Sequence, residues 1–317
     1  SVMGVLLGGV MTRRHLDQLG ASGLSAEAAA EMAFGREEKT KANWWILGGG
    51  LVFVIFTVGM GLSDTSFNKE IIFVGSMAIV LFLMRRLIKV LEPEDRLTLV
   101  GTAVIIFVYR AMPTPGAGQT WWMIDELRFD QQFLAVLSLI SSVLTLLGMF
   151  LFRRFMAERS IAYVIVFLTI ASSVLYMPII GMFYGLHEIT ASLTGGVVDA
   201  RFIALVDTAL ESPLGQIAMI PMLAWIANSA PANLKATFFA VMASFTNLAL
   251  SASQLGTKYL NRVFTVTREV KDRANDAITL PADYSELGFL MWSAMLLGLI
   301  VPIAAVMVIR LSPYRSA

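Results

Sequence analysis

Eight apolar runs, each about as long as a membrane-spanning helix, constrain the fold of this chain more than any other feature. A helix of about 20 apolar residues crosses a hydrocarbon core of about 30 Å. Isolated strands leave backbone groups unsatisfied in lipid, so each run is predicted to be a helix. The sequence therefore predicts an all-α integral membrane protein. The runs lie near residues 44–62, 70–91, 97–112, 131–152, 160–186, 202–228, 234–257 and 286–310.

The composition agrees with a membrane bundle and removes several classes of site. Hydrophobic residues make up 57% of the chain and charged residues 15%, whereas soluble domains carry about 25% charged residues. There is no cysteine, and the two histidines form no zinc-protease motif,. The net charge of +1 gives no sign of a nucleic-acid partner. We expect no cofactor and no metal, and we do not expect an enzyme.

The first residues predict an organisation in two parts. Residues 1–10 are apolar but too short to span, so we expect them to be the end of a helix that begins before Ser1,. A charged loop follows over 11–43. The prediction is thus about eight complete transmembrane helices plus a partial one. Residues 1–91 would be the remnant of an N-terminal bundle, and 92–317 would form a C-terminal six-helix bundle.

Lysine and arginine gather on alternate loops, which predicts the orientation. Fifteen of the 24 basic residues lie on one side, and basic loops favour the cytoplasm,. The C-terminus is therefore expected inside, and the short loops lead us to assume a bacterial inner membrane. The mixed charges of 258–285 indicate a solvated extension of the preceding helix. The fifteen residues lie in 11–43, 85–96, 153–159, 229–235 and 310–317.

Two carboxylates, Asp207 and Glu211, lie inside the apolar run 202–228. Charges in hydrocarbon cost several kcal/mol unless they are relieved, and so they mark functional sites. A spacing of four puts both on one helix face. Counted from Arg201 at about 1.5 Å per residue, Asp207 lies roughly 9 Å deep and Glu211 roughly 15 Å deep. Glu211 is therefore the candidate proton carrier, and Asp207 is either a second site residue or an ion-pair partner of Arg110 or Lys258.

The run 234–257 presents a polar stripe that could face the same site. At about 100° per residue, its members fall within roughly a third of the helix circumference. Asn247 and Gln254 carry amides that need partners in hydrocarbon, whereas small residues often serve packing alone. The small residues Ser138, Ser141, Thr145 and Gly148 are interpreted as such a packing face. The polar stripe consists of Thr237, Ser244, Asn247, Ser251, Gln254 and Lys258.

Several segments resemble the folate-biopterin transporter family of the major facilitator superfamily. The stretch Asp207-Thr-Ala-Leu-Glu-Ser-Pro and the later Ala230-Pro-Ala-Asn-Leu-Lys-Ala-Thr are similar to that family. So are Tyr109-Arg-Ala-Met-Pro-Thr-Pro and the pair Trp121-Trp122, which fall where the family has a proline-rich helix end and an aromatic outer loop. The resemblance covers about residues 95–260 and aligns the last six runs with helices seven to twelve.

The resemblance implies a major-facilitator-type helical bundle that works by alternating access. Its substrate would be a pterin, a folate or another small organic anion, moved by symport with protons. Arg110 and Lys258 could then supply charge to the solute. Asn247, Gln254, Ser244 and Trp121 or Trp122 could supply hydrogen bonds or stacking. The alternative is an assembly or scaffold protein of the same superfamily, whose partner would be a membrane-protein complex.

Overall fold

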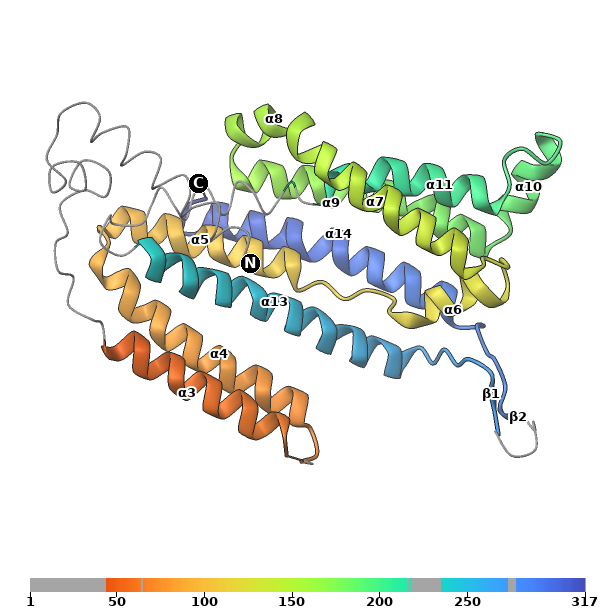
Figure 1. Ribbon diagram of the computed structural model, residues 1–317. Helices are drawn as coiled ribbons and strands as arrows, with labels where there is room; N and C mark the ends of the chain where they lie inside the picture. Colours follow the sequence, from red (N-terminus) through yellow and green to blue (C-terminus); the bar gives the residue numbers. More distant parts are fainter. Residues whose placement is uncertain (1–43, 64, 216, 218–234, 273–277, 317) are drawn as a thin grey trace, which may run out of the picture. The chain divides into compact units, whose positions relative to one another are not determined.

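The computed structural model describes residues 44–317 apart from 64, 216, 218–234, 273–277 and 317 (Figure 1). Residues Gly48–Ala317 form one compact unit. The predicted partial helix 1–10 and the loop 11–43 lie outside the described residues. The elements are α3 (Trp44–Gly61), α4 (Asn68–Leu87), η1 (Ile88–Val90), α5 (Pro93–Arg110), α6 (Ala117–Asp125), α7 (Gln131–Leu151), α8 (Arg153–Glu158), α9 (Ile161–Phe183), α10 (Leu186–Leu193), α11 (Ala200–Glu211), η2 (Ser212–Leu214), α13 (Lys235–Val263), β1 (Val270–Lys271), β2 (Ile278–Leu280) and α14 (Leu287–Leu311).

The structure confirms the predicted all-α membrane fold. In the described part of the chain, six helices are long and apolar enough to cross a membrane. Large apolar side chains such as Leu139, Phe150 and Ile300 face outward on these helices, as expected of a protein surrounded by lipid,. The six are α3, α4 with η1, α7, α9, α13 and α14.

Side-chain caps fix where two of the helices begin. The carboxylate of Asp130 accepts a hydrogen bond from the Phe133 backbone N–H (2.7 Å), and Asp199 accepts one from Phe202 (2.8 Å). These are the caps of α7 and α11. Each satisfies a backbone donor that the first helical turn leaves without a partner. The caps therefore set the register in which α11 presents Asp207 and Glu211.

Two of the eight predicted spans differ in the structure. The run 97–112 becomes α5, which begins at Pro93 with an acidic first turn and ends at Arg110. The run 202–228 was predicted as one helix, but α11 ends at Glu211 and the 3-10 turn η2 follows. Pro213 has no N–H for a helical hydrogen bond and crowds a preceding carbonyl, and the change from α11 to η2 falls directly before it. Residues 218–228 of this prediction lie outside the described residues.

The long helices α13 and α14 each pack mainly against two neighbouring helices. α14 packs against α9 and α5, and α13 packs against α4 and α5 (Figure 1). α11 lies between α9 and α7. A buried cluster joins Trp122 of α6 to Met182 of α9 and Leu290 of α14. Within the segment predicted to be an aromatic outer loop, Trp122 is therefore a buried side chain on the short helix α6.

The segment after α13 ends in a two-stranded hairpin. The predicted helix extension is correct as far as Val263, where α13 ends. β1 and β2 then pair antiparallel, with Val270 opposite Leu280. Backbone hydrogen bonds of 3.0 Å in both directions join Thr267 to Asp283 and close the base of the hairpin. The residues of mixed charge in this segment thus lie on a β-hairpin rather than on a longer helix.

Candidate functional site

Asp207 and Glu211 lie one turn apart in the last part of α11, and both are half-buried. Within the described residues, the buried Oδ1 atom of Asp207 has no hydrogen-bond partner. Lys258, one of the two predicted ion-pair partners of Asp207, pairs with Glu70 instead (2.6 Å), and among the described residues no ion pair joins Asp207 to Arg110. An unpartnered carboxylate oxygen in an apolar setting is costly. The pair therefore needs a role other than a structural ion pair.

Glu211 lines a cavity of about 370 Å³. Its walls come from the end of α5, from α9 and from α14, and they are mostly apolar with a few hydroxyl groups. Among the described residues of this wall, Glu211 is the one that carries a full charge. Such a cavity, apolar with few polar groups, is typical of a small-molecule site. The other lining residues are Tyr109, Met112, Pro113, Thr114, Pro115, Thr169, Ser172, Ser173, Tyr176, Ala294, Met295 and Gly298.

The proline-rich wall of this cavity is held by α13. The Thr114 backbone N–H donates to the Thr257 hydroxyl (2.9 Å), and the Ser253 hydroxyl donates to the Met112 carbonyl (2.6 Å). The Asn261 amide donates to the Pro115 carbonyl (3.2 Å). The sequence analysis missed these three α13 residues. Their spacing of four was the available signal, since it marks one helix face.

α7 supports the turn that follows Glu211. The Ser212 hydroxyl lies 2.9 Å from the Ser141 hydroxyl, and the Thr145 hydroxyl donates to the Ser212 carbonyl (3.0 Å). A Cβ atom added at Gly148 would come within 2.6 Å of the Pro213 Cα atom. Ser141, Thr145 and Gly148 of the predicted packing face therefore pack against η2, whereas Ser138 is exposed.

The remaining predicted site residues are not brought into the Glu211 cavity. Ser244 and Asn247 are exposed on α13, and the Ser244 hydroxyl donates back to the Ala240 carbonyl (2.8 Å). Gln254 lines a different cavity, between α3, α4 and α13. Arg110 is half-buried at the end of α5, next to the cavity residue Tyr109. The polar stripe of α13 and the carboxylates of α11 therefore belong to separate surroundings.

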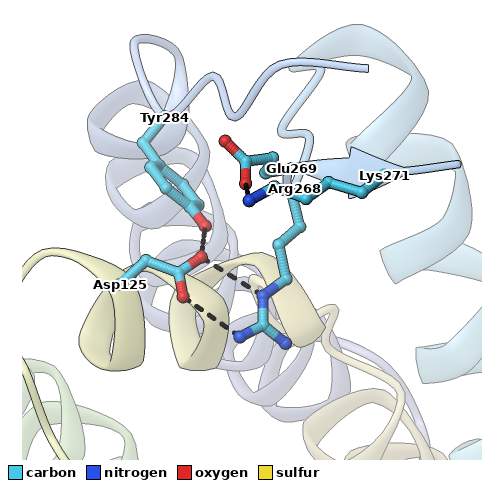
Figure 2. Close-up of polar contacts among 5 residues, drawn as sticks. All are labelled: Asp125, Arg268, Glu269, Lys271 and Tyr284. Atoms are coloured by element: carbon cyan, nitrogen blue, oxygen red, sulfur yellow. Dashed lines mark hydrogen bonds and ion pairs between the residues drawn. The ribbon is translucent and has the colours of Figure 1, made fainter. Parts of the chain in front are cut away.

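A polar cluster outside the spanning helices fastens the hairpin to α6. Figure 2 shows the Asp125 carboxylate between the guanidinium of Arg268 and the hydroxyl of Tyr284. Arg268 donates twice, from Nη2 to Oδ1 (3.0 Å) and from Nε to Oδ2 (3.2 Å), and the Tyr284 hydroxyl donates to Oδ2 (2.5 Å). The hydrogen bonds from Arg268 lower the pKa of Asp125. Burial, and then the bond to Asp125, raises the pKa of Tyr284.

Comparison with known proteins gives two curated relatives. A protein of Synechocystis sp. named folate-biopterin transporter is 28% identical over 168 residues, which are 50% of this chain and 33% of the relative. A protein of Plasmodium berghei that carries the name of a proposed folate transporter is 26% identical over 167 residues, which are 51% of this chain and 34% of the relative. Each match thus spans about a third of the relative's length.

No solved structure matches the chain. The names of the two relatives are those of transporters, which agrees with the prediction that the chain is not an enzyme. The model of the BT1 family matches residues 24–308, well over half of the chain. The chain therefore belongs to the BT1 family, as the folate-biopterin transporter resemblance of its sequence predicted.

Proposed function

We propose that this chain is part of a secondary active transporter that moves a pterin-like, folate-like or other small organic anion together with protons. The names of the two relatives support the substrate class. The observation that carries the proposal is the half-buried Glu211 carboxylate in the wall of a cavity of about 370 Å³. A largely apolar cavity with one ionisable carboxylate suits a solute and a proton in the same place.

Proton coupling follows from the cost of the charge. A carboxylate is expensive in a dry, closed cavity and inexpensive in one that is open to water. Binding a proton removes the charge, so protonated Glu211 permits closure and release of the proton accompanies opening to the other side. Asp207, one turn away, shares the electrostatic environment and is the second proton-binding candidate.

Alternating access would use the two predicted parts of the protein. In this proposal, residues 1–91 belong to one bundle and 92–317 to the other, and the bundles rock around the site. The protein would lie in a bacterial inner membrane with a cytoplasmic C-terminus. Arg110, Ser244, Asn247 and Gln254 stay candidates for contact with the solute in other conformations of the cycle.

Uptake by vesicles tests the proposal. The full-length protein in vesicles should accumulate radiolabelled folate or biopterin when the outside is acidic, and a protonophore should collapse the accumulation. Glu211→Gln should reduce it at least tenfold, because the side chain can no longer exchange a proton. Glu158→Gln is the matched control, since Glu158 is exposed and pairs with Arg154 on the short helix α8.

The outcomes separate the two halves of the proposal. Full accumulation by the Glu211→Gln protein would remove the coupling role from that residue. Absence of uptake of either compound by the wild-type protein, with correct insertion verified, would remove the substrate class.

A further inference from the structure

A second cavity, separate from the Glu211 cavity, lies between α3, α4 and α13. It encloses about 320 Å³. This volume is at the lower end of known ligand sites, which suits one end of a solute rather than the whole of a large one. It is lined by Phe53, Thr57, Lys69, Ile72, Phe73, Ser76, Leu248, Ser251, Gln254, Leu255 and Lys258.

The charges at this cavity do not cancel. Lys258 Nζ lies 2.6 Å from Glu70 Oε1, and the Tyr259 hydroxyl donates to the same oxygen (2.8 Å). One carboxylate thus compensates one ammonium. Lys69 also lines the cavity, and among the described residues it has no hydrogen bond or ion pair. Two lysines against one glutamate leave one positive charge at the cavity.

Uncharged polar groups complete the lining. The hydroxyl of Thr57 is buried and has no hydrogen-bond partner within the described residues. The Gln254 amide and the Ser251 and Ser76 hydroxyls also face this space. A buried hydroxyl without a partner costs free energy that a ligand or water relieves. The cavity therefore offers a free positive charge together with hydrogen-bond donors, which is the inventory that an anionic oxygen group requires.

We propose that this cavity binds the carboxylate end of an organic anion, with Lys69 as the charge that selects it and Lys258, Thr57 and Gln254 as further donors. The inference rests on the proposed function and deepens it. Folate and biopterin share a pterin ring, but folate ends in a glutamate with two carboxylates and biopterin has none. The cavity therefore recognises the part of folate that biopterin lacks.

Lys69 is the residue that tests the assignment most cleanly. It has no partner to lose among the described residues, so Lys69→Gln removes a charge without breaking an ion pair. The Lys258→Gln change would strand Glu70 and confuse binding with stability. Lys89→Gln is the matched control, because Lys89 is exposed, as Lys69 is, but lies beyond the opposite end of α4, in η1, and does not line the cavity.

The experiment measures the binding of folate and of biopterin to the purified full-length protein by titration calorimetry. Lys69→Gln should raise the dissociation constant for folate about tenfold, or about 1.4 kcal/mol, and change that for biopterin less than twofold. Lys69→Arg should keep folate binding close to wild type, since it keeps the charge. Lys89→Gln should change neither.

Several outcomes would overturn the assignment. They are an unchanged folate constant in Lys69→Gln, an equal loss for both compounds, and a wild-type protein that does not bind folate. Vesicle uptake separates this inference from the proposed function. Lys69-dependent folate binding without proton-driven uptake would contradict transport and leave the cavity assigned. Proton-driven uptake with folate binding that is independent of Lys69 would contradict the cavity and leave transport standing.

Discussion

Gly148→Ala should destabilise the protein through the turn that carries Glu211. The Cβ atom added by this change would meet the backbone of Pro213, at 2.6 Å from its Cα atom. Backbone cannot rotate away as a flexible side chain can, so α7 and η2 must separate. Overpacking of this kind costs about 1–3 kcal/mol. The contact holds Ser212 and Pro213, which directly follow Glu211, so the carboxylate should move with them.

The gain in helix propensity opposes this cost and can be measured separately. Replacing glycine with alanine inside a helix contributes about 0.5–1 kcal/mol. Gly59 lies inside α3, and nothing lies within 4 Å of a Cβ atom added there. Gly59→Ala therefore contributes the propensity term alone. The two variants should differ in stability by about 1–3 kcal/mol, which is the cost of the contact with Pro213.

The assay is thermal unfolding of the purified variants in one detergent, followed by vesicle uptake normalised to folded protein. Gly148→Ala should melt below the wild type and Gly59→Ala should not. Uptake per folded molecule should fall only in Gly148→Ala. Equal melting temperatures for the two alanine variants would refute the reasoning, because the contact with η2 would then carry no energetic weight.

Two further predictions concern the loops. Because hydrogen bonds from Arg268 lower the pKa of Asp125 in the folded state, this pair stabilises the hairpin above the ordinary pKa of 3.8 and ceases to do so as the pH falls through the folded value,. The amide protection factors in β1 and β2, which are exchange rates normalised to the intrinsic rate at each pH, should therefore be constant from pH 5 to 8 and decrease below about pH 4. Asp125→Asn should weaken the attachment by about 0.5–1 kcal/mol at neutral pH, and unchanged protection in that variant would contradict the assignment. Thr257→Val should lower the free energy of unfolding by about 0.5–1.5 kcal/mol and reduce uptake, since it removes the hydrogen bond to Thr114 in the wall of the Glu211 cavity. Thr98→Val is the control, because among the described residues the Thr98 hydroxyl bonds only to the Glu94 carbonyl of its own helix. Identical uptake by the two variants would speak against a role for the wall.

Much of the fold could be predicted because the bilayer reduces the choices of the chain. Apolar length alone placed α3, α7, α9 and α14 within a few residues of their observed ends,. Prediction failed where one local group outweighs hydropathy. α11 ends directly before Ser212 and Pro213 inside an apolar run, and Asp125 binds Arg268 at a hairpin base where the charge pattern suggested a helix. Neither effect changes the average hydropathy of the segment.

The candidate site was predicted in part, for a different physical reason. A spacing of four does place Asp207 and Glu211 on one face of α11, because local helix geometry fixes that relation,. It does not say which helix lies opposite. The predicted partners Asn247 and Gln254 lie elsewhere, and the cavity is completed by α5, α9 and α14. Which helices become neighbours is decided by the packing between helices. The periodicity of polar residues within one helix carries no information about that packing.

α13 connects the two cavities in a way that its sequence pattern does not reveal. Thr257 and Lys258 are adjacent, so their side chains point about 100° apart. Thr257 holds the proline-rich wall of the Glu211 cavity, while Lys258 lines the second cavity, between α3, α4 and α13, and pairs with Glu70. A displacement of this part of α13 must therefore disturb the contacts of both cavities together. If a bound carboxylate draws Lys258 away from Glu70, we expect the same helix turn to shift the wall beside Glu211, which would couple the two proposed binding events.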